Sequence, residues 1–173
     1  MGERRHDNPA ARNPKMWTPR RDTVEEGFGH DAYEAHHHLA EPTVCTECEA
    51  VYHRGRWTWM DEPPPGGEEA LCPACRRVRD QYPAGLLRLD GPFALAHEDD
   101  LVRLAQNEAA AETAEHPLNR VIQIETDASG ILITTTDVHL PRRIGEAIER
   151  AFHGHFDLKY AEEDQMVRAR WAR

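Results

Sequence analysis

The sequence has no long hydrophobic run and no apolar segment near its start. No stretch of about 18 residues is apolar throughout, so we expect no membrane-spanning helix and no membrane partner. Residues 1–17, MGERRHDNPAARNPKMW, lack the apolar core of a secretory signal, and we therefore expect a cytoplasmic protein. Disulfides are uncommon in that compartment, so the four cysteines of the chain indicate metal or redox chemistry.

Motifs of common enzymes are also missing. The glycines of PPPGG, residues 63–67, are not followed by the Lys and Ser/Thr of a phosphate-binding loop. Ser129 lies in a predicted turn with no acid–base motif near it. The acidic residues 98–100 are explained as charges at the N-terminus of a helix. No catalytic residue is predicted, and we expect a protein that is not an enzyme.

Charge is unevenly distributed along the 173 residues. The formal net charge of −10 argues against nonspecific nucleic-acid binding by the whole chain. Residues 1–21 nevertheless carry six Lys or Arg against two acidic residues. Prolines and polar residues without apolar periodicity predict a disordered basic arm over residues 1–40. Its histidine tract, His36–His38, is interpreted as solvated, since three consecutive residues do not share one helical face.

The four cysteines form two Cys-x-x-Cys pairs separated by residues 49–71. Each pair places two sulfurs on one side of a tight turn, and two such turns supply the four tetrahedral ligands that Zn²⁺ prefers. The segment between the pairs is longer than usual, and DEPPPGGEEA, residues 61–70, accounts for the excess as a loop. The sequence therefore predicts a zinc ribbon over residues 41–82 with one structural Zn²⁺ per chain. The predicted ligands are Cys45, Cys48, Cys72 and Cys75.

A redox dithiol is the main alternative use of these cysteines. Such dithiols lie at helix N-termini. Cys45 and Cys48 precede a predicted strand, whereas Cys72 and Cys75 precede a possible short helix, RRVRDQY. A single redox dithiol would not require the second pair. A catalytic zinc is disfavoured as well, because four cysteine ligands leave no open coordination position.

Arginine and tryptophan gather next to both cysteine pairs. GRWTW, residues 55–59, is a predicted strand with Trp57 and Trp59 on one face. These rings either cover a ribbon too small to build its own core or offer a surface on which bases stack. The candidate residues for binding RNA or another partner near the cysteines are Arg54, Arg56, Trp57, Trp59, Arg76, Arg77 and Arg79.

From residue 83 onward regular patterns predict an α+β domain, residues 83–173. A strand over 85–90 is followed by a helix over 97–116, two strands around a turn at 127–130, a helix over 137–154 and a final pair of strands. This β-α-β-β-α-β-β order is typical of a ferredoxin-like sandwich with one extra strand. The predicted fold class is α+β, with a small zinc ribbon in front of the sandwich.

The last two strands, 155–160 and 165–171, alternate apolar and polar residues. A loop over residues 161–164 would pair Leu158 with Val167 and Phe156 with Ala169, and Asp157 would face Arg168. The polar face of this hairpin supplies the remaining candidate RNA-binding residues, Lys159, Arg168 and Arg170.

The stretch EPTVCTECEAVYHRGRWTW, with LCPACRRVRDQYPAGLL after the loop, resembles a widespread, poorly characterised bacterial family with this zinc-knuckle and GRWxW arrangement. Residues 45 to about 160 are also distantly similar to the N-terminal region of the adaptor that exports the large ribosomal subunit in eukaryotes, and to its archaeal relatives. The shared features are the Cys-x-x-Cys pairs, the CxxCRR exit, a helix before HPLNRVIQIE, and ITTTDVHLPRRIGEAI followed by LKY. The resemblance implies zinc at the four cysteines and a ribosomal partner. The adaptor has more Cys-x-x-Cys pairs than the two found here, and we expect its later domains to be absent from this protein.

Three functions follow as hypotheses. The first is a non-enzymatic zinc protein that binds RNA or a ribosomal particle. The second is a protein–protein adaptor, favoured by the ten Lys or Arg against sixteen acidic residues, a net charge of −6, over residues 83–173. The third is a thiol redox protein.

Overall fold

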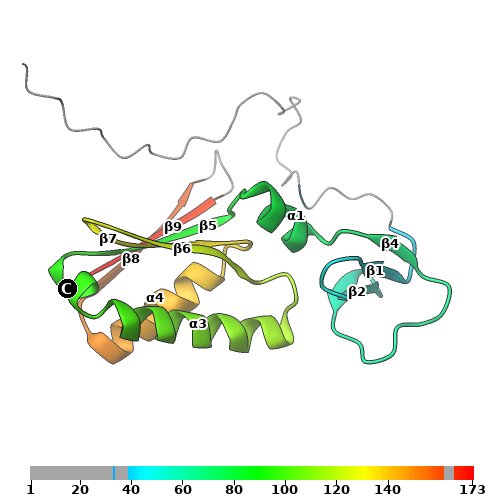
Figure 1. Ribbon diagram of the computed structural model, residues 1–173, viewed down its shortest axis with the longest axis horizontal. Coiled ribbons are helices and arrows are strands. Elements are labelled where there is room, and N and C mark those ends of the chain that lie inside the picture. Colours follow the sequence, from blue (N-terminus) through cyan, green and yellow to red (C-terminus); the bar gives the residue numbers. More distant parts are fainter. Residues whose placement is uncertain (1–32, 34–38, 162–165) are drawn as a thin grey trace, which may run out of the picture.

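The computed structural model describes Tyr33, residues 39–161 and residues 166–173 (Figure 1). The predicted disordered arm, residues 1–40, and its histidine tract lie almost wholly outside the described residues. Within them, the protein is a mixed α+β structure with two sheets and four helices, which confirms the predicted fold class. No helix among these residues is both long enough and apolar enough to cross a bilayer.

The ribbon, residues 41–82, contains a four-stranded sheet and one helix. The strands lie in the order β3-β2-β1-β4, with β4 parallel to β1 and the other pairs antiparallel. The predicted loop over residues 61–70 is therefore too long, because its last three residues pair with β1. The elements are β1 (Thr43–Cys45), β2 (Val51–His53), β3 (Arg56–Thr58), β4 (Glu68–Ala70) and α1 (Pro73–Asp80).

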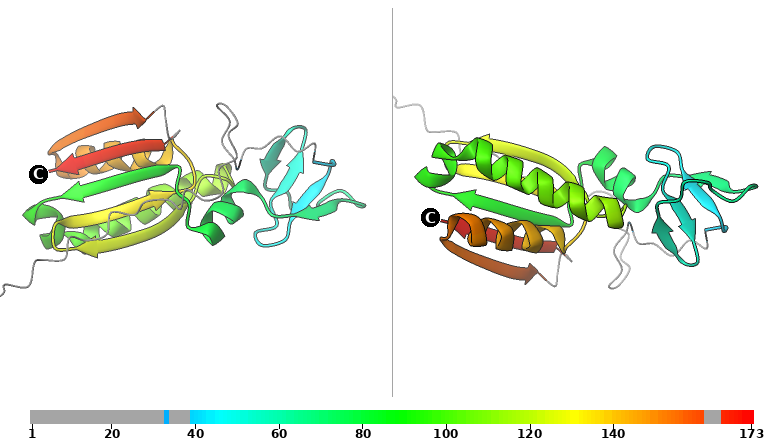
Figure 2. Two further views of the ribbon diagram at one scale, coloured as in Figure 1. Left: turned by 90° about the horizontal axis from the view of Figure 1, so that it is seen from above. Right: turned by 90° about the horizontal axis from the view of Figure 1, so that it is seen from below.

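The α+β domain is a five-stranded sheet with helices on one face (Figures 1 and 2). Its strand order is β6-β7-β5-β9-β8, so the extra strand β9 lies inside the sheet, parallel to β5. Both long helices, α3 and α4, cover the same face, and the short helix α2 was not predicted. The elements are β5 (Gly85–Asp90), α2 (Pro92–Ala96), α3 (Glu98–Glu115), β6 (Val121–Asp127), β7 (Gly130–Thr135), α4 (Leu140–Phe152), β8 (His155–Ala161) and β9 (Met166–Ala172).

The core of this domain lies between the sheet and the two long helices. Ile144 and Ile148, on one stripe of α4, are fully buried against strand residues such as Leu87 and Ile133. Near the end of α4, Ala151 is exposed, whereas Phe152 is partly buried and packs against the same core. Burying each of the aliphatic side chains in this core contributes about 1.5–3 kcal/mol to the free energy of folding, and this burial holds helix and sheet together.

The helix ends follow the sequence signals. The Oδ2 atom of Asp137 accepts the backbone N–H groups of His139, at 2.7 Å, and of Leu140, at 3.0 Å. Pro141 lies in the first turn of α4. Gly154, with φ of +97°, follows its last turn and adopts a backbone conformation that favours glycine.

The predicted register of the final hairpin is wrong by two positions. Strand β8 continues through Ala161, so the connection begins one residue later than predicted. A shift by two keeps every side chain on its predicted face, and it brings Phe156 opposite the fully buried Trp171. The observed pairs include Phe156–Trp171, Asp157–Arg170, Leu158–Ala169 and Ala161–Met166.

Candidate metal centre

The four cysteines of the ribbon come together in one largely buried cluster. Cys45 ends β1 and Cys48 lies in the turn that follows it. Cys72 is the N-cap of α1, and Cys75 lies in its first turn. All four Sγ atoms lie within 4.8 Å of one another, and Cys48 is the one ligand candidate that is not fully buried.

The spacing of the sulfurs fits a tetrahedral metal site. Zn–S bonds of about 2.3 Å imply about 3.8 Å between two sulfurs that bind the same ion. The Cys48 and Cys72 Sγ atoms are 3.8 Å apart, and all four cysteines are free of disulfides. The cluster can hold a metal ion, in agreement with the predicted ligand set.

Backbone N–H groups point at the sulfurs. The N–H of Cys72 donates to the Cys45 Sγ atom at 3.3 Å, and that of Cys75 donates to the Cys72 Sγ atom at 3.4 Å. The second bond is the N-terminal cap of α1, a role that a thiolate fills well at the positive end of a helix. Both bonds stabilise negative charge on sulfur before any metal binds.

Burial of the cysteines and repulsion between their sulfurs oppose negative charge on the thiols. Burial raises the pKa of the Cys72 thiol to about 12 and raises the pKa of Cys75 well above its usual range. For Cys45, burial also acts upward, but N–H donors, the backbone of Cys72 foremost, lower the pKa to about 7. Four sulfurs this close carry four negative charges only around a cation, so the chemistry of the donor set fits a divalent metal.

Arg120, which the sequence did not single out, reaches this cluster from the α+β domain. Its Nη1 atom donates to the Cys75 Sγ atom at 3.5 Å, and its Nε atom donates to the Pro117 carbonyl at 2.6 Å. Burial acts to lower the pKa of Arg120, but the sulfurs of Cys48, Cys75 and Cys72 outweigh it, so this pKa is raised. Leu118, two residues earlier, packs against the buried cysteines. The ribbon and the α+β domain therefore meet at the cysteine cluster.

The two tryptophans do not form one open surface. Trp57 is half-buried against the cysteine cluster, and its ring lies 5.6 Å from that of Tyr52, its cross-strand partner. The Nε1 atom of Trp59 donates to the carbonyl of Thr113 in α3 at 2.7 Å. Trp59 keeps 38% of its surface exposed, and the Arg120 guanidinium lies 5.7 Å from its ring centre. Trp59 thus joins the ribbon to the α+β domain.

Arg54 and Arg56 stand on either side of Gly55, at the tip of the β2–β3 hairpin. Arg54 and Gly55 have φ of 52° and 75°, the left-handed region that a tight hairpin turn requires. The carboxylate of Glu41 accepts their backbone N–H groups at 2.7 and 2.9 Å, which fixes the tip. Both arginines are exposed, and neither forms an ion pair with any residue that the structure describes.

The three arginines of α1 differ in exposure. Arg77 is buried, with its guanidinium 4.5 Å from the Tyr33 ring centre and its Nη1 atom donating to the Tyr82 carbonyl at 3.1 Å. Arg76 is half-buried, and the exposed Arg79 lies 3.5 Å from the carboxylate of its neighbour Asp80. Arg77 therefore has a structural position, while Arg79 faces solvent.

The remaining candidates, Lys159, Arg168 and Arg170, are exposed on the neighbouring strands β8 and β9 of the five-stranded sheet. Arg170 contacts the Asp90 carboxylate at 2.5 Å. The Lys159 Nζ atom lies 3.7 Å from the carboxylate of Asp157. Arg170 and Lys159 therefore each lie next to a carboxylate.

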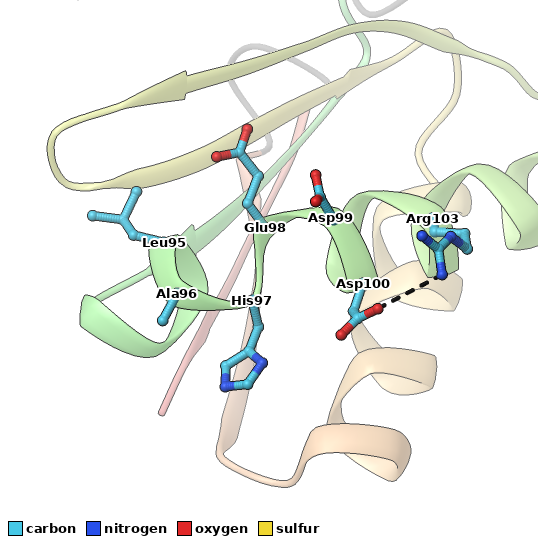
Figure 3. A pocket seen from close by; sticks show the side chains of 7 residues that line it. All are labelled: Leu95, Ala96, His97, Glu98, Asp99, Asp100 and Arg103. Carbon is cyan, nitrogen blue, oxygen red and sulfur yellow. Dashed lines mark ion pairs between the residues drawn. The ribbon is translucent and has the colours of Figure 1, made fainter.

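A shallow hollow lies where α2 meets α3, at the opposite end of the molecule from the cysteines. Its acidic side chains do not converge: Glu98 and Asp99 point to one side of the chain, and Asp100 points to the other with His97 (Figure 3). Asp100 lies 3.7 Å from Arg103, and Glu98 accepts the hydroxyl of Thr126 at 2.6 Å. These residues are explained as first-turn charges of α3, as predicted.

No family model, no curated protein and no solved structure matches the chain. The resemblance to the bacterial zinc-knuckle family and to the export adaptor stays a prediction.

Proposed function

We propose that the cysteine cluster binds one structural Zn²⁺ and that the ribbon it holds together binds RNA, either free or in a ribosomal particle, without catalysing a reaction. Zinc is proposed because four cysteine sulfurs at this spacing match its tetrahedral preference and leave no position for a substrate. Its role is to hold a ribbon whose own apolar core is small.

The observation that carries the RNA proposal is the basic tip of the β2–β3 hairpin. Arg54 and Arg56 are exposed and free of ion pairs in the described part of the chain, on an otherwise acidic protein. Glu41 holds the turn between them, so both guanidinium groups start from a fixed backbone. Phosphate groups bind arginine through paired hydrogen bonds, and no described residue forms an ion pair with either of these two side chains. Tyr52 and Trp57, next to the tip, add aromatic surface for bases.

The experiment is a binding titration of the full chain with a short fluorescein-labelled single-stranded RNA of mixed sequence. Replacing Arg54 and Arg56 together by alanine is expected to weaken binding about tenfold and to lower the slope of log affinity against log salt by about one to two. The matched control replaces Arg103 and Arg150, two exposed arginines of the α+β domain, and is expected to bind as the wild type does.

Sedimentation of the tagged protein through a sucrose gradient at low salt separates free RNA from ribosomal particles as the partner. Co-migration with particles that is lost in the Arg54/Arg56 variant supports the ribosomal reading. If the hairpin variant and the control variant bind RNA and sediment alike, the hairpin is not the RNA-binding element.

A protein partner is the second candidate, and the open face of the five-stranded sheet favours it. The cations there are already paired, Arg170 with Asp90 and Lys159 with Asp157, so they offer less to phosphate than the hairpin tip does. Copurification of one protein with the tagged chain after RNase treatment would support this reading. Loss of that protein on RNase treatment counts against it.

A further inference from the structure

Arg120 is held in place before it reaches the metal centre. Its backbone N–H donates to the Thr136 hydroxyl at 2.9 Å, and its Nε atom donates to the Pro117 carbonyl at 2.6 Å. Arg120 and Pro117 lie in the segment between α3 and β6, and Thr136 directly follows β7, so both bonds lie within the α+β domain. They aim the Nη atoms at the cysteine cluster, where Nη1 donates to Cys75.

The second terminal nitrogen of Arg120, Nη2, also indicates that the thiolates of the cluster are its acceptors. Nη2 is buried and has no hydrogen-bond partner among the described residues. A buried guanidinium nitrogen without an acceptor is energetically unfavourable. Thiols are weak acceptors, whereas thiolates bound to a metal carry charge and accept strongly. Metal binding therefore strengthens the contacts of Arg120 far more than those of an arginine that faces solvent.

The Arg120 side chain also lies next to Trp59, the second residue that joins the ribbon to the α+β domain. Its guanidinium lies 5.7 Å from the ring centre of Trp59, whose Nε1 atom donates to the Thr113 carbonyl at the C-terminal part of α3. Figure 1 shows the end of α3 directed toward the ribbon. Arg120 is thus in contact with a metal ligand, with the docking tryptophan and with its own domain at once.

We propose that Arg120 is an outer-sphere donor to the metal-bound thiolates, through which metal occupancy holds the ribbon against the α+β domain. Four thiolates around a divalent ion have a net charge of −2, and the guanidinium reduces it to −1 in a buried site. Coupling of this kind is reciprocal, so docking of the ribbon also raises the affinity for the metal. The inference rests on the proposed metal centre and is independent of RNA binding.

The test uses the full chain loaded with Co²⁺, which reports on its sulfur ligands by colour. A hydrogen bond to a thiolate lowers the energy of the sulfur electrons, so its removal moves the thiolate-to-cobalt charge-transfer band to longer wavelength. Arg120→Met is expected to show that shift and to lose the metal to a chelator about tenfold faster than the wild type. Arg120→Lys keeps the charge without the planar guanidinium. Its band position and its rate of metal release are expected to lie between those of Arg120→Met and the wild type. Arg103→Met, an exposed site on α3, is the control and is expected to match the wild type.

Hydrogen exchange of residues 113–120 measures the coupling itself. Metal removal is expected to raise exchange of this segment in the wild type and in Arg103→Met. In Arg120→Met the segment is expected to exchange fast even with metal bound, while the core of the α+β domain stays protected. An unshifted band together with an unchanged release rate in Arg120→Met overturns the proposal. A wild-type chain that takes up no cobalt overturns the metal centre itself, which is a different result.

Discussion

Replacing Cys72 with serine is expected to abolish metal binding and to unfold the ribbon, while the α+β domain stays folded. Cys72 is fully buried, caps α1 and lies 3.8 Å from the sulfur of Cys48, so it serves both the helix and the ligand set. Metal binding in small zinc domains contributes about 10–16 kcal/mol of apparent folding free energy, far more than the small apolar cluster of the ribbon supplies. The five-stranded sheet has its own core and does not need the metal.

Hydrogen exchange followed by mass spectrometry distinguishes these outcomes in one experiment. Backbone amides of β1, β2 and α1 are expected to exchange near the rate of an unfolded chain in the Cys72→Ser variant, while those of β5, β7 and β9 keep their protection. Thr46→Ser, a change at an exposed residue inside the first Cys-x-x-Cys turn, is the matched control. Retained protection of the ribbon in Cys72→Ser would mean that the metal does not hold it.

Replacing Trp171 with alanine is expected to lower the free energy of unfolding of the α+β domain by about 3–5 kcal/mol. Trp171 is fully buried in β9, and its Nε1 atom donates to the His153 carbonyl at 2.7 Å. Its ring forms a T-shaped pair with the ring of Phe93, with 6.0 Å between the centroids. The substitution removes the largest fully buried side chain and leaves the carbonyl without its donor.

Urea unfolding, monitored by far-UV circular dichroism, measures this change. Tyr160→Ala in the neighbouring strand is the control, because Tyr160 is 63% exposed and its loss is expected to matter by less than about 1 kcal/mol. Equal losses of stability in the two variants would contradict the assignment of the core to the helix-covered face of the sheet.

The sequence predicts correctly the features of this protein that are set by residues close together along the chain. The two Cys-x-x-Cys turns are local, so their spacing predicted the cluster of Cys45 with Cys72 correctly. The helix from Glu98 to Glu115 ends before Pro117, as the proline dictates. The register of β8 against β9 was wrong because an alternating pattern looks the same after a shift of two.

The roles of single side chains at the junction depend on partners far away in the sequence. Trp59 meets Thr113 across 54 positions, and Arg120 meets Cys75 across 45. No pattern in the sequence near either residue predicts the contact. The sequence therefore left Trp59 open to two interpretations, packing or base stacking, and it did not single out Arg120. The burial of Arg77 likewise depends on Tyr33, which lies in a segment without apolar periodicity. Position in the tertiary structure decides which arginine faces solvent, and sequence alone does not.

The most direct test of a zinc-dependent ribbon is the metal content of the purified full-length chain, determined by native mass spectrometry together with elemental analysis. The account predicts one zinc per chain, with thiols that react only after chelation, and no metal in the Cys72→Ser variant. A metal-free chain with four reactive thiols, purified without a chelator, would contradict it.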